Sequence, residues 1–135
     1  MKSPIRVLLC DDRALMRSRC CEILAPASDV EVVGEAEGGY EGIAFALGLV
    51  PDVVVMDVDM PDLDGIEATR RIVTERPEIK VLGYSAGSEP QVVDEMLSAG
   101  ASGYLVKGGH PDEFLEAIRV IKGGGRYFSP GIPAQ

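Results

Sequence analysis

The amino-acid sequence predicts a doubly wound α/β fold, in which helices cover both faces of a parallel sheet. Short continuous apolar runs recur along the chain, segments with helical periodicity separate them, and Gly or Pro marks many boundaries. The chain has 135 residues, of which 46% are hydrophobic and 26% are charged. This is the size and composition of one domain that buries a sizeable core.

Five segments are expected to form the strands. Residues 5–10 (IRVLLC) and 52–56 (DVVVM) are continuous apolar runs, as is typical of central parallel strands buried on both faces. Three further candidates are residues 30–35, 79–84 and 103–106. A helix-period segment follows every strand. Right-handed crossovers then favour the flavodoxin-like, three-layer α/β/α arrangement of five strands in the order 2-1-3-4-5.

The helices are predicted from apolar stripes and from their boundaries. Asp64-Gly65 and Pro111 stand where the third and fifth helices should begin, Pro77 follows the third, and Gly100 follows the fourth. Stripes that can cover the sheet occur in the first helix (Met16, Cys20, Ile23, Leu24), the fourth (Val92, Val93, Met96, Leu97) and the fifth (Phe114, Ala117, Ile118, Ile121).

The last residues differ in composition from the rest of the chain. The tail GGGRYFSPGIPAQ is rich in Gly and Pro, as is typical of a chain that leaves a domain for a linker. We therefore expect one domain over residues 1–124 and the start of a linker over residues 125–135.

Charge and cysteine content exclude several classes of function. The formal net charge of -9, from 22 acidic and 13 basic residues, argues against binding of nucleic acid or an anionic membrane through this segment. There is no signal-peptide pattern at the start and no run that approaches a membrane span, so a cytoplasmic location is expected. Cys10, Cys20 and Cys21 have neither disulfide-framework nor metal-ligand spacing and are interpreted as reduced packing residues.

Acidic residues close the two central strands of the predicted sheet. Asp11 and Asp12 follow the first strand, Asp57 ends the third, and Asp59 lies two residues further on. Ligands of this topology bind at the carboxyl ends of these strands. A single Asp there is usually a cap, but three converging carboxylates repel one another unless a cation joins them. Mg²⁺ is the natural candidate, since it takes oxygen ligands and leaves a position for a phosphoryl oxygen.

Two further polar residues are expected at the same edge. Ser85 ends the fourth strand and Lys107 follows the fifth. Alone, each would be interpreted as an ordinary turn or surface residue. Beside the acids, an ammonium and a hydroxyl can stabilise the charge that arrives with a phosphoryl group.

These residues resemble the receiver domains of bacterial two-component response regulators over nearly the whole chain. Within that superfamily, AGASGYLVK followed by GGGRYFSP is similar to regulators of the NarL/FixJ type, which carry a LuxR-type helix-turn-helix after a linker. The matching motifs are Asp11-Asp12 after an apolar strand, Asp57 in VVVMDVDMPDLDG, Ser85 in VLGYSA, and Tyr104 and Lys107 in ASGYLVKGG.

The resemblance implies a chemistry for the acids. Asp57 would accept a phosphoryl group from a histidine of a sensor kinase or a phosphotransfer protein, and the domain would catalyse only this transfer and its own dephosphorylation. Mg²⁺ would be bound by the side chains of Asp12 and Asp57 and by the backbone carbonyl of Asp59. Asp11 would act mainly through metal-bound water.

The resemblance also implies a switch. Lys107 and Ser85 would contact the phosphoryl group, and movement of Ser85 would open space for Tyr104 to swing inward. The face formed by the fourth helix, the fifth strand and the fifth helix would then repack as the output surface, with homodimerisation as one outcome. DNA would be contacted by a C-terminal domain absent from this chain, and transcription would be controlled through it.

Some residues depart from the family pattern or invite a second interpretation. Ser85 replaces the commoner threonine but keeps the hydroxyl, and Gly108 stands where many receivers have proline. Arg13, Arg17 and Arg19 lie at the start of the first helix, beside the acidic pocket. They are interpreted as a solvated helix face, with docking of an acidic partner as the alternative.

Three rival functions agree less well with the sequence. The D-V-D at residues 57–59 resembles the nucleophile and acid of haloacid dehalogenase-type phosphatases, but those enzymes place it after their first strand and need a longer chain. A flavodoxin-like cofactor binder needs a phosphate loop where DDRALMR would repel phosphate. A receiver that has lost phosphorylation and serves only for docking is opposed by the intact acids and Lys107.

Overall fold

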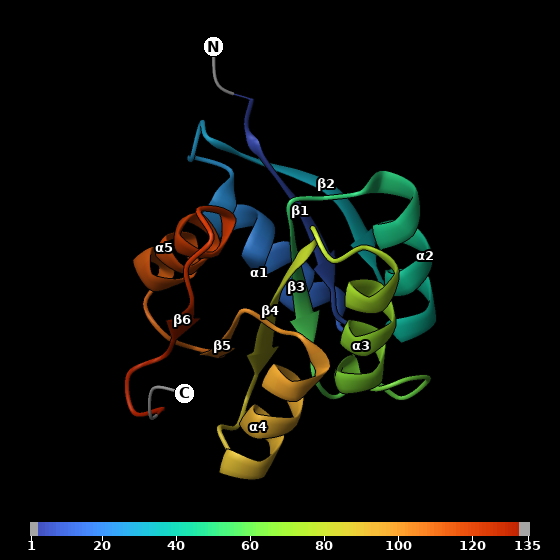
Figure 1. The fold of residues 1–135 in the computed structure, drawn as a ribbon. Helices are drawn as coiled ribbons and strands as arrows, with labels where there is room; N and C mark the ends of the chain where they lie inside the picture. Colours follow the sequence, from blue (N-terminus) through green and yellow to red (C-terminus); the bar gives the residue numbers. More distant parts are fainter. Residues whose placement is uncertain (1–2, 133–135) are drawn as a thin grey trace.

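Six parallel strands form one sheet in the order β2-β1-β3-β4-β5-β6, as the computed structural model of residues 3–132 shows (Figure 1). The strands are β1 Ile5–Cys10, β2 Val30–Ala36, β3 Val53–Asp57, β4 Lys80–Ser85, β5 Gly103–Val106 and β6 Tyr127–Phe128. The helices are α1 Ala14–Leu24, α2 Gly39–Leu49, α3 Gly65–Glu75, α4 Pro90–Ala99 and α5 Pro111–Lys122.

The predicted α/β class is confirmed, as is the order of the first five strands. Each of these strands begins and ends within one residue of its predicted range. The predicted starts of α3 and α5 are also confirmed: Asp64 caps α3 by accepting a hydrogen bond from the amide of Glu67 at 2.9 Å, and Pro111 opens α5. α4 ends at Ala99 and is followed, as predicted, by Gly100, whose φ of +116° favours glycine.

The prediction of five strands is wrong, because the tail adds a sixth. Tyr127 and Phe128 pair in parallel with Gly103 and Tyr104 of β5, and the amide of Ser129 donates to the carbonyl of Tyr104 at 3.0 Å. β5 would otherwise be an open edge with unpaired backbone groups. A two-residue strand is too short to show an alternation of apolar and polar residues, and the surrounding Gly and Pro residues indicated a linker. The strand could therefore not be predicted from the sequence.

The predicted linker over residues 125–135 is therefore only partly described. Residues 127 and 128 are strand, and Ile132 is buried against the core. Residues 133–135 lie outside the described part of the chain. The division of the native protein at residue 124 stays a prediction.

Helices cover both faces of the sheet. α1 and α5 lie on one face and α2, α3 and α4 on the other (Figure 1). Successive strand side chains point to opposite faces, so in β1 Val7 and Leu9 pack with α1 and α5 while Leu8 and Cys10 pack on the other side. With both faces covered, polar chemistry is left to the ends of the strands.

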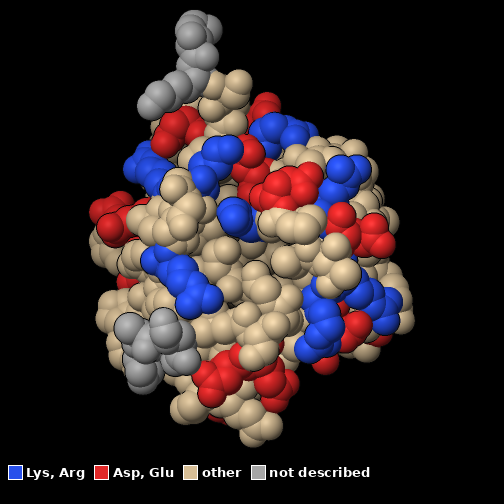
Figure 2. Space-filling model, viewed as in Figure 1, with Lys and Arg blue, Asp and Glu red and all other residues tan. Residues whose placement is uncertain are grey.

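The surface charges and the helix lengths are relevant to the predictions about nucleic-acid binding and membranes. Figure 2 shows basic and acidic side chains interspersed over the face in view. Within residues 3–132, every helix is too short or too polar for a bilayer crossing. The predicted cytoplasmic location stays a prediction.

Candidate functional site

Three aspartates meet at the carboxyl edge of β1 and β3. Asp11, Asp12 and Asp57 each place one carboxylate oxygen within 4.8 Å of the others. Asp11 and Asp57 are buried, whereas Asp12 is exposed. β1 and β3 are neighbouring parallel strands, so their ends, and the acids that follow, lie side by side. The structure thus brings these residues together as predicted.

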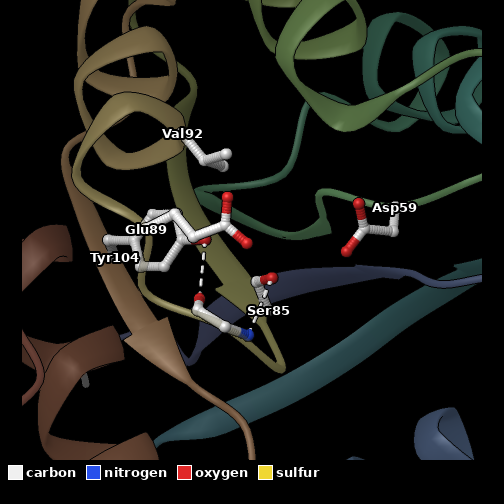
Figure 3. A pocket seen from close by; sticks show the side chains of 6 residues that line it. Asp59, Ser85, Glu89, Val92 and Tyr104 are labelled. Carbon is white, nitrogen blue, oxygen red and sulfur yellow. Dashed lines mark hydrogen bonds between the residues drawn. The ribbon is translucent and has the colours of Figure 1, made fainter.

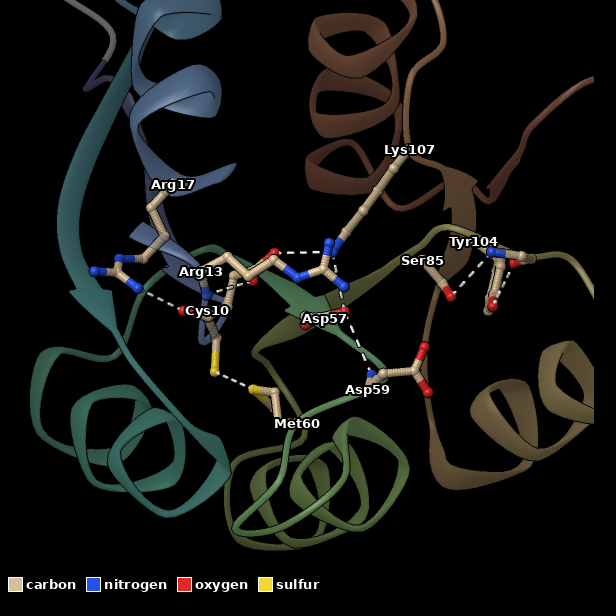
Figure 4. A network of polar contacts seen from close by, with 11 residues as sticks. Cys10, Arg13, Arg17, Asp57, Asp59, Met60, Ser85, Tyr104 and Lys107 are labelled. Carbon is tan, nitrogen blue, oxygen red and sulfur yellow. Dashed lines mark hydrogen bonds and ion pairs between the residues drawn. The ribbon is translucent and has the colours of Figure 1, made fainter. Parts of the chain in front are cut away.

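Lys107 joins this cluster from the end of β5 (Figure 4). Its ammonium donates to Asp11 Oδ2 at 2.9 Å and to Asp57 Oδ1 at 3.1 Å, and all three side chains are less than a tenth exposed. Burial lowers the pKa of Lys107, but the bond to Asp11 and the charge of Asp57 raise it above its ordinary value. The lysine therefore stays charged and holds two buried carboxylates in place.

Asp57 has one oxygen that is paired and one that is not. Oδ1 accepts hydrogen bonds from Lys107 and, at 3.3 Å, from the amide of Asp59. Oδ2 is buried and has no hydrogen-bond partner among the described residues. Burial raises the pKa of Asp57 to about 6, Lys107 opposes this rise, and Asp11 adds to it.

This donor set fits a hard divalent cation. The acids supply only oxygen atoms, one of them an orphaned buried acceptor, and their charge exceeds that of the single lysine. The side chains of Asp12 and Asp57 are the groups that would hold Mg²⁺ directly. Both carboxylate oxygens of Asp11 already accept hydrogen bonds, from Arg13 and Lys107, so Asp11 would act mainly through metal-bound water. Asp59 is exposed and meets the cluster through its amide, and the metal-ligand role of its carbonyl stays a prediction.

Ser85 and Tyr104 lie on the other side of the site, around a small cavity (Figure 3). Ser85 is buried at the end of β4, and its hydroxyl accepts from the amide of Gly87 at 3.4 Å, which leaves its proton free to be donated elsewhere. Tyr104 is fully buried, and its hydroxyl donates to the carbonyl of Gly87 at 3.0 Å. The cavity, of about 90 Å³, is lined by Asp59, Ser85, Gly87, Glu89, Val92 and Tyr104.

Gly83 makes the buried position of Tyr104 possible, a role that was not predicted from the sequence. A β-carbon at Gly83 would lie 3.2 Å from the Tyr104 ring and 3.0 Å from the end of Met96. A larger side chain there would compete with the ring for the same space. The available signal was a glycine in the interior of a predicted strand, which often marks a close approach.

The solvated-face interpretation of the arginines is wrong for Arg17. Arg13 and Arg19 are exposed as expected, but only 8% of Arg17 is exposed. Its guanidinium donates to the backbone carbonyl of Asp11 at 2.6 Å. The sequence grouped Arg17 with Arg13 and Arg19 at the start of the first helix, and only the tertiary fold directs its guanidinium to the backbone of the loop that carries the acids.

A comparison with protein families matches residues 7–119 to the response regulator receiver domain. The chain belongs to this family. The receiver domain carries every site residue that the sequence singled out, with Asp57, Ser85 and Lys107 at the ends of their strands. The match leaves no observation that favours the phosphatase alternative.

Sequence relatives of this receiver domain are response regulators. It is 43% identical to the response regulator GacA of Pseudomonas viridiflava, with 97% of this chain and 61% of GacA covered. It is 37% identical to UvrY of Escherichia coli K12, with 97% of this chain and 60% of UvrY covered. The chain thus spans about three fifths of the length of these curated relatives.

Solved structures place this receiver domain among the NarL- and LuxR-family regulators. A LuxR-family two-component response regulator from Aurantimonas has a TM-score of 0.92 and 33% identity, with 96% of this receiver domain and 93% of that chain covered. The receiver domain of the NarL regulator from Mycobacterium tuberculosis has a TM-score of 0.88 and 31% identity, with 91% and 99% covered.

Proposed function

We propose that this receiver domain is a phosphoacceptor and that Asp57 takes the phosphoryl group. The observation that carries the proposal is the unpaired, buried Oδ2 of Asp57 beside Lys107 and two further acids. Buried polar atoms are almost always paired, so an orphaned carboxylate oxygen marks a position where another group binds.

The transfer uses a carboxylate oxygen of Asp57 as the nucleophile. This oxygen attacks the phosphorus of a phosphohistidine on a sensor kinase or a phosphotransfer protein. The P–N bond breaks, its electron pair returns to the histidine nitrogen, and an acyl phosphate forms on Asp57. Mg²⁺, when bound, neutralises charge on the phosphoryl oxygens.

The remaining polar groups compensate the new charge. Lys107 contacts Asp57 already and can keep its ammonium on the phosphoryl oxygens after transfer. Ser85 has a hydroxyl proton to donate, from the buried end of the neighbouring strand. In this proposal the domain catalyses only its own phosphorylation and dephosphorylation and is otherwise a signalling module.

The signal would leave through the face formed by α4, β5 and α5. Ser85 and Tyr104 contact the same Gly87 backbone, so a movement of Ser85 toward the phosphoryl group reaches Tyr104 directly. We propose that this change controls dimerisation and a C-terminal helix-turn-helix domain of the native regulator. The greater length of the relatives supports such a further segment.

A mass measurement tests the proposal. A small phosphodonor with Mg²⁺ should add one phosphoryl mass to the wild-type domain, and addition of EDTA should prevent it. Asp57→Asn should gain nothing, whereas Asp94→Asn on the exposed side of α4 should be modified like the wild type. An unmodified wild type, beside a known receiver that is labelled in the same tube, would exclude the phosphoacceptor function.

A further inference from the structure

Arg17 is a buried cation that the proposed phosphotransfer leaves without a role. Its side chain starts near the beginning of α1 and reaches the loop that joins β1 to α1 (Figure 4). Besides the 2.6 Å bond from Nη1 to the Asp11 carbonyl, Nε donates to Glu35 at 3.2 Å and Nη2 lies 3.6 Å from Glu37. One guanidinium thus links the ends of β1 and β2.

The bond to the Asp11 carbonyl matters because that carbonyl belongs to the peptide group between Asp11 and Asp12. The same turn is held by the Asp11 amide, which donates to Ala36 at 3.0 Å, and by the Arg13 amide, which donates to Asp11 Oδ1 at 2.9 Å. A peptide group is planar, so fixing its carbonyl fixes the start of the next residue. Arg17 therefore sets the direction in which the Asp12 side chain leaves the backbone.

Asp12 has few other constraints. It is exposed, and its carboxylate accepts no hydrogen bond from the described residues, yet that carboxylate lies within 4.8 Å of those of Asp11 and Asp57. An exposed side chain keeps such a position only if its backbone is well fixed, because a small rotation of the peptide moves the carboxylate away from the shared position.

The two glutamates serve to aim the guanidinium. Glu35 and Glu37 are 46% and 74% exposed, so their ion pairs with Arg17 are screened by water. They occupy Nε and Nη2 and leave Nη1 directed at the Asp11 carbonyl. The planar fork of arginine makes these contacts together, whereas a lysine offers a single nitrogen.

We propose that Arg17 is a positioning residue for the cation site: it orients the Asp11–Asp12 peptide and so places the Asp12 carboxylate. This inference rests on the proposed function, since it concerns the same Mg²⁺. Residues that orient metal ligands typically change metal affinity by about 10- to 100-fold when replaced. The effect should therefore be on cation affinity rather than on the phosphoryl transfer itself.

The test measures cation binding without any reaction. Mn²⁺ is titrated into the wild type, Arg17→Met, Arg17→Lys and the control Arg19→Met, and free Mn²⁺ is followed by electron paramagnetic resonance. Arg19 is exposed on the same helix and has the same charge, so its variant shows the effect of charge alone. In parallel, the rate of labelling by acetyl phosphate is measured against Mg²⁺ concentration.

We expect Arg17→Met to raise the Mn²⁺ Kd by about tenfold, Arg17→Lys to recover part of this loss, and Arg19→Met to bind like the wild type. The Mg²⁺ concentration for half-maximal labelling should rise by the same factor, while the rate at saturating Mg²⁺ stays within about twofold. A folded Arg17→Met with the wild-type Kd overturns the inference.

Two further outcomes distinguish a failure of the inference about Arg17 from a failure of the proposed function. If Arg17→Met does not fold, the double variant Glu35→Gln, Glu37→Gln replaces it, because it frees the guanidinium without removing it. A Kd raised about two- to threefold then supports the role of Arg17, and an unchanged Kd overturns it. If the wild type itself binds no Mn²⁺, the proposed function fails first.

Discussion

At the scale of single residues, the site consists of charged side chains that are buried, although burial disfavours charge. Asp57 and Asp11 are buried next to one another with a single ammonium between them. Breaking such a pair leaves an uncompensated charge, whereas replacing the acid removes the repulsion with it. These buried charges therefore lower the stability of the fold at the position where a cation is proposed to bind.

Asp57→Asn should make the domain more stable at neutral pH. The folded-state pKa of Asp57 is about 6, above its ordinary 3.8, so its contribution to stability is fully present below about pH 4. It is lost as the pH rises through 6, by up to about 3 kcal/mol. In urea unfolding with EDTA present, the free energy of unfolding of Asp57→Asn should exceed that of the wild type at pH 7.5 but not at pH 4. Mg²⁺ should reduce this difference in unfolding free energy. If the wild type and Asp57→Asn are equally stable at both pH values, the electrostatic explanation is wrong.

Gly83→Val should drive the Tyr104 ring out of its buried position. The branches of valine would extend into the space next to the ring, because even the β-carbon at residue 83 would lie only 3.2 Å from it. We expect a loss of about 1 to 3 kcal/mol in unfolding free energy and a solvent-accessible Tyr104, measured by its reactivity toward nitration. Gly83→Ala, which needs shifts of only a few tenths of an ångström, is the milder control. An unreactive Tyr104 in Gly83→Val would show that the ring does not depend on this glycine.

At the scale of elements, the junction of β3 and α3 fixes the position of Asp57. Asp57 ends β3, and the loop returns so closely that the amide of Gly65 donates to the carbonyl of Val58 at 2.9 Å. The start of α3 thus packs directly on the backbone of Asp57, so a change at the start of this helix should move Asp57.

Gly65→Ala should therefore disturb both stability and labelling. Its β-carbon would lie 2.1 Å from the Asp57 carbonyl oxygen and 2.9 Å from Val58 Cα, so the backbone must move. We expect a loss of about 2 kcal/mol or more in chemical unfolding and slower labelling by a phosphodonor. The matched control is Gly48→Ala in α2, where nothing lies within 4 Å and about 0.5 to 1 kcal/mol should be gained. Normal labelling in Gly65→Ala would contradict the close-packing argument.

At the scale of the whole molecule, the tail closes the sheet beside Tyr104. Ser129 is buried, and its hydroxyl accepts from the amide of Val106 at 2.8 Å and donates to Glu113 on α5 at 3.0 Å. Through Ser129 the segment after α5 touches the strand that carries Tyr104 and leads to Lys107. A movement of β5 would therefore also move a linker that begins at this point.

Removal of residues 125–135 should destabilise the domain and open an edge of the sheet. The unpaired edge of β5 favours pairing with a second copy. We expect a lower Tm and concentration-dependent self-association, measured by light scattering after size-exclusion chromatography. Ser129→Ala should cost about 1 to 2 kcal/mol without self-association, because it removes hydrogen bonds but keeps the strand. A truncated domain with unchanged Tm and size would show that β6 contributes nothing to closure.

The sequence alone determined the first five strands, the order in which they pair and the residues of the acidic cluster. These features are readable because they depend on local patterns: buried strands are continuous apolar runs, and the topology then brings the acids after β1 and β3 together. Asp11, Asp12, Asp57, Ser85 and Lys107 could be selected in this way.

Only the tertiary structure decided the rest. β6 forms because β5 has a free edge, Arg17 is buried because the beginning of α1 lies beside the ends of β1 and β2, and Tyr104 is buried because Gly83 leaves space for its ring. Each depends on contacts between segments far apart in the sequence, whose spacing no local periodicity records. For the same reason the unpaired oxygen of Asp57, which supports the proposed function most directly, became visible only in three dimensions.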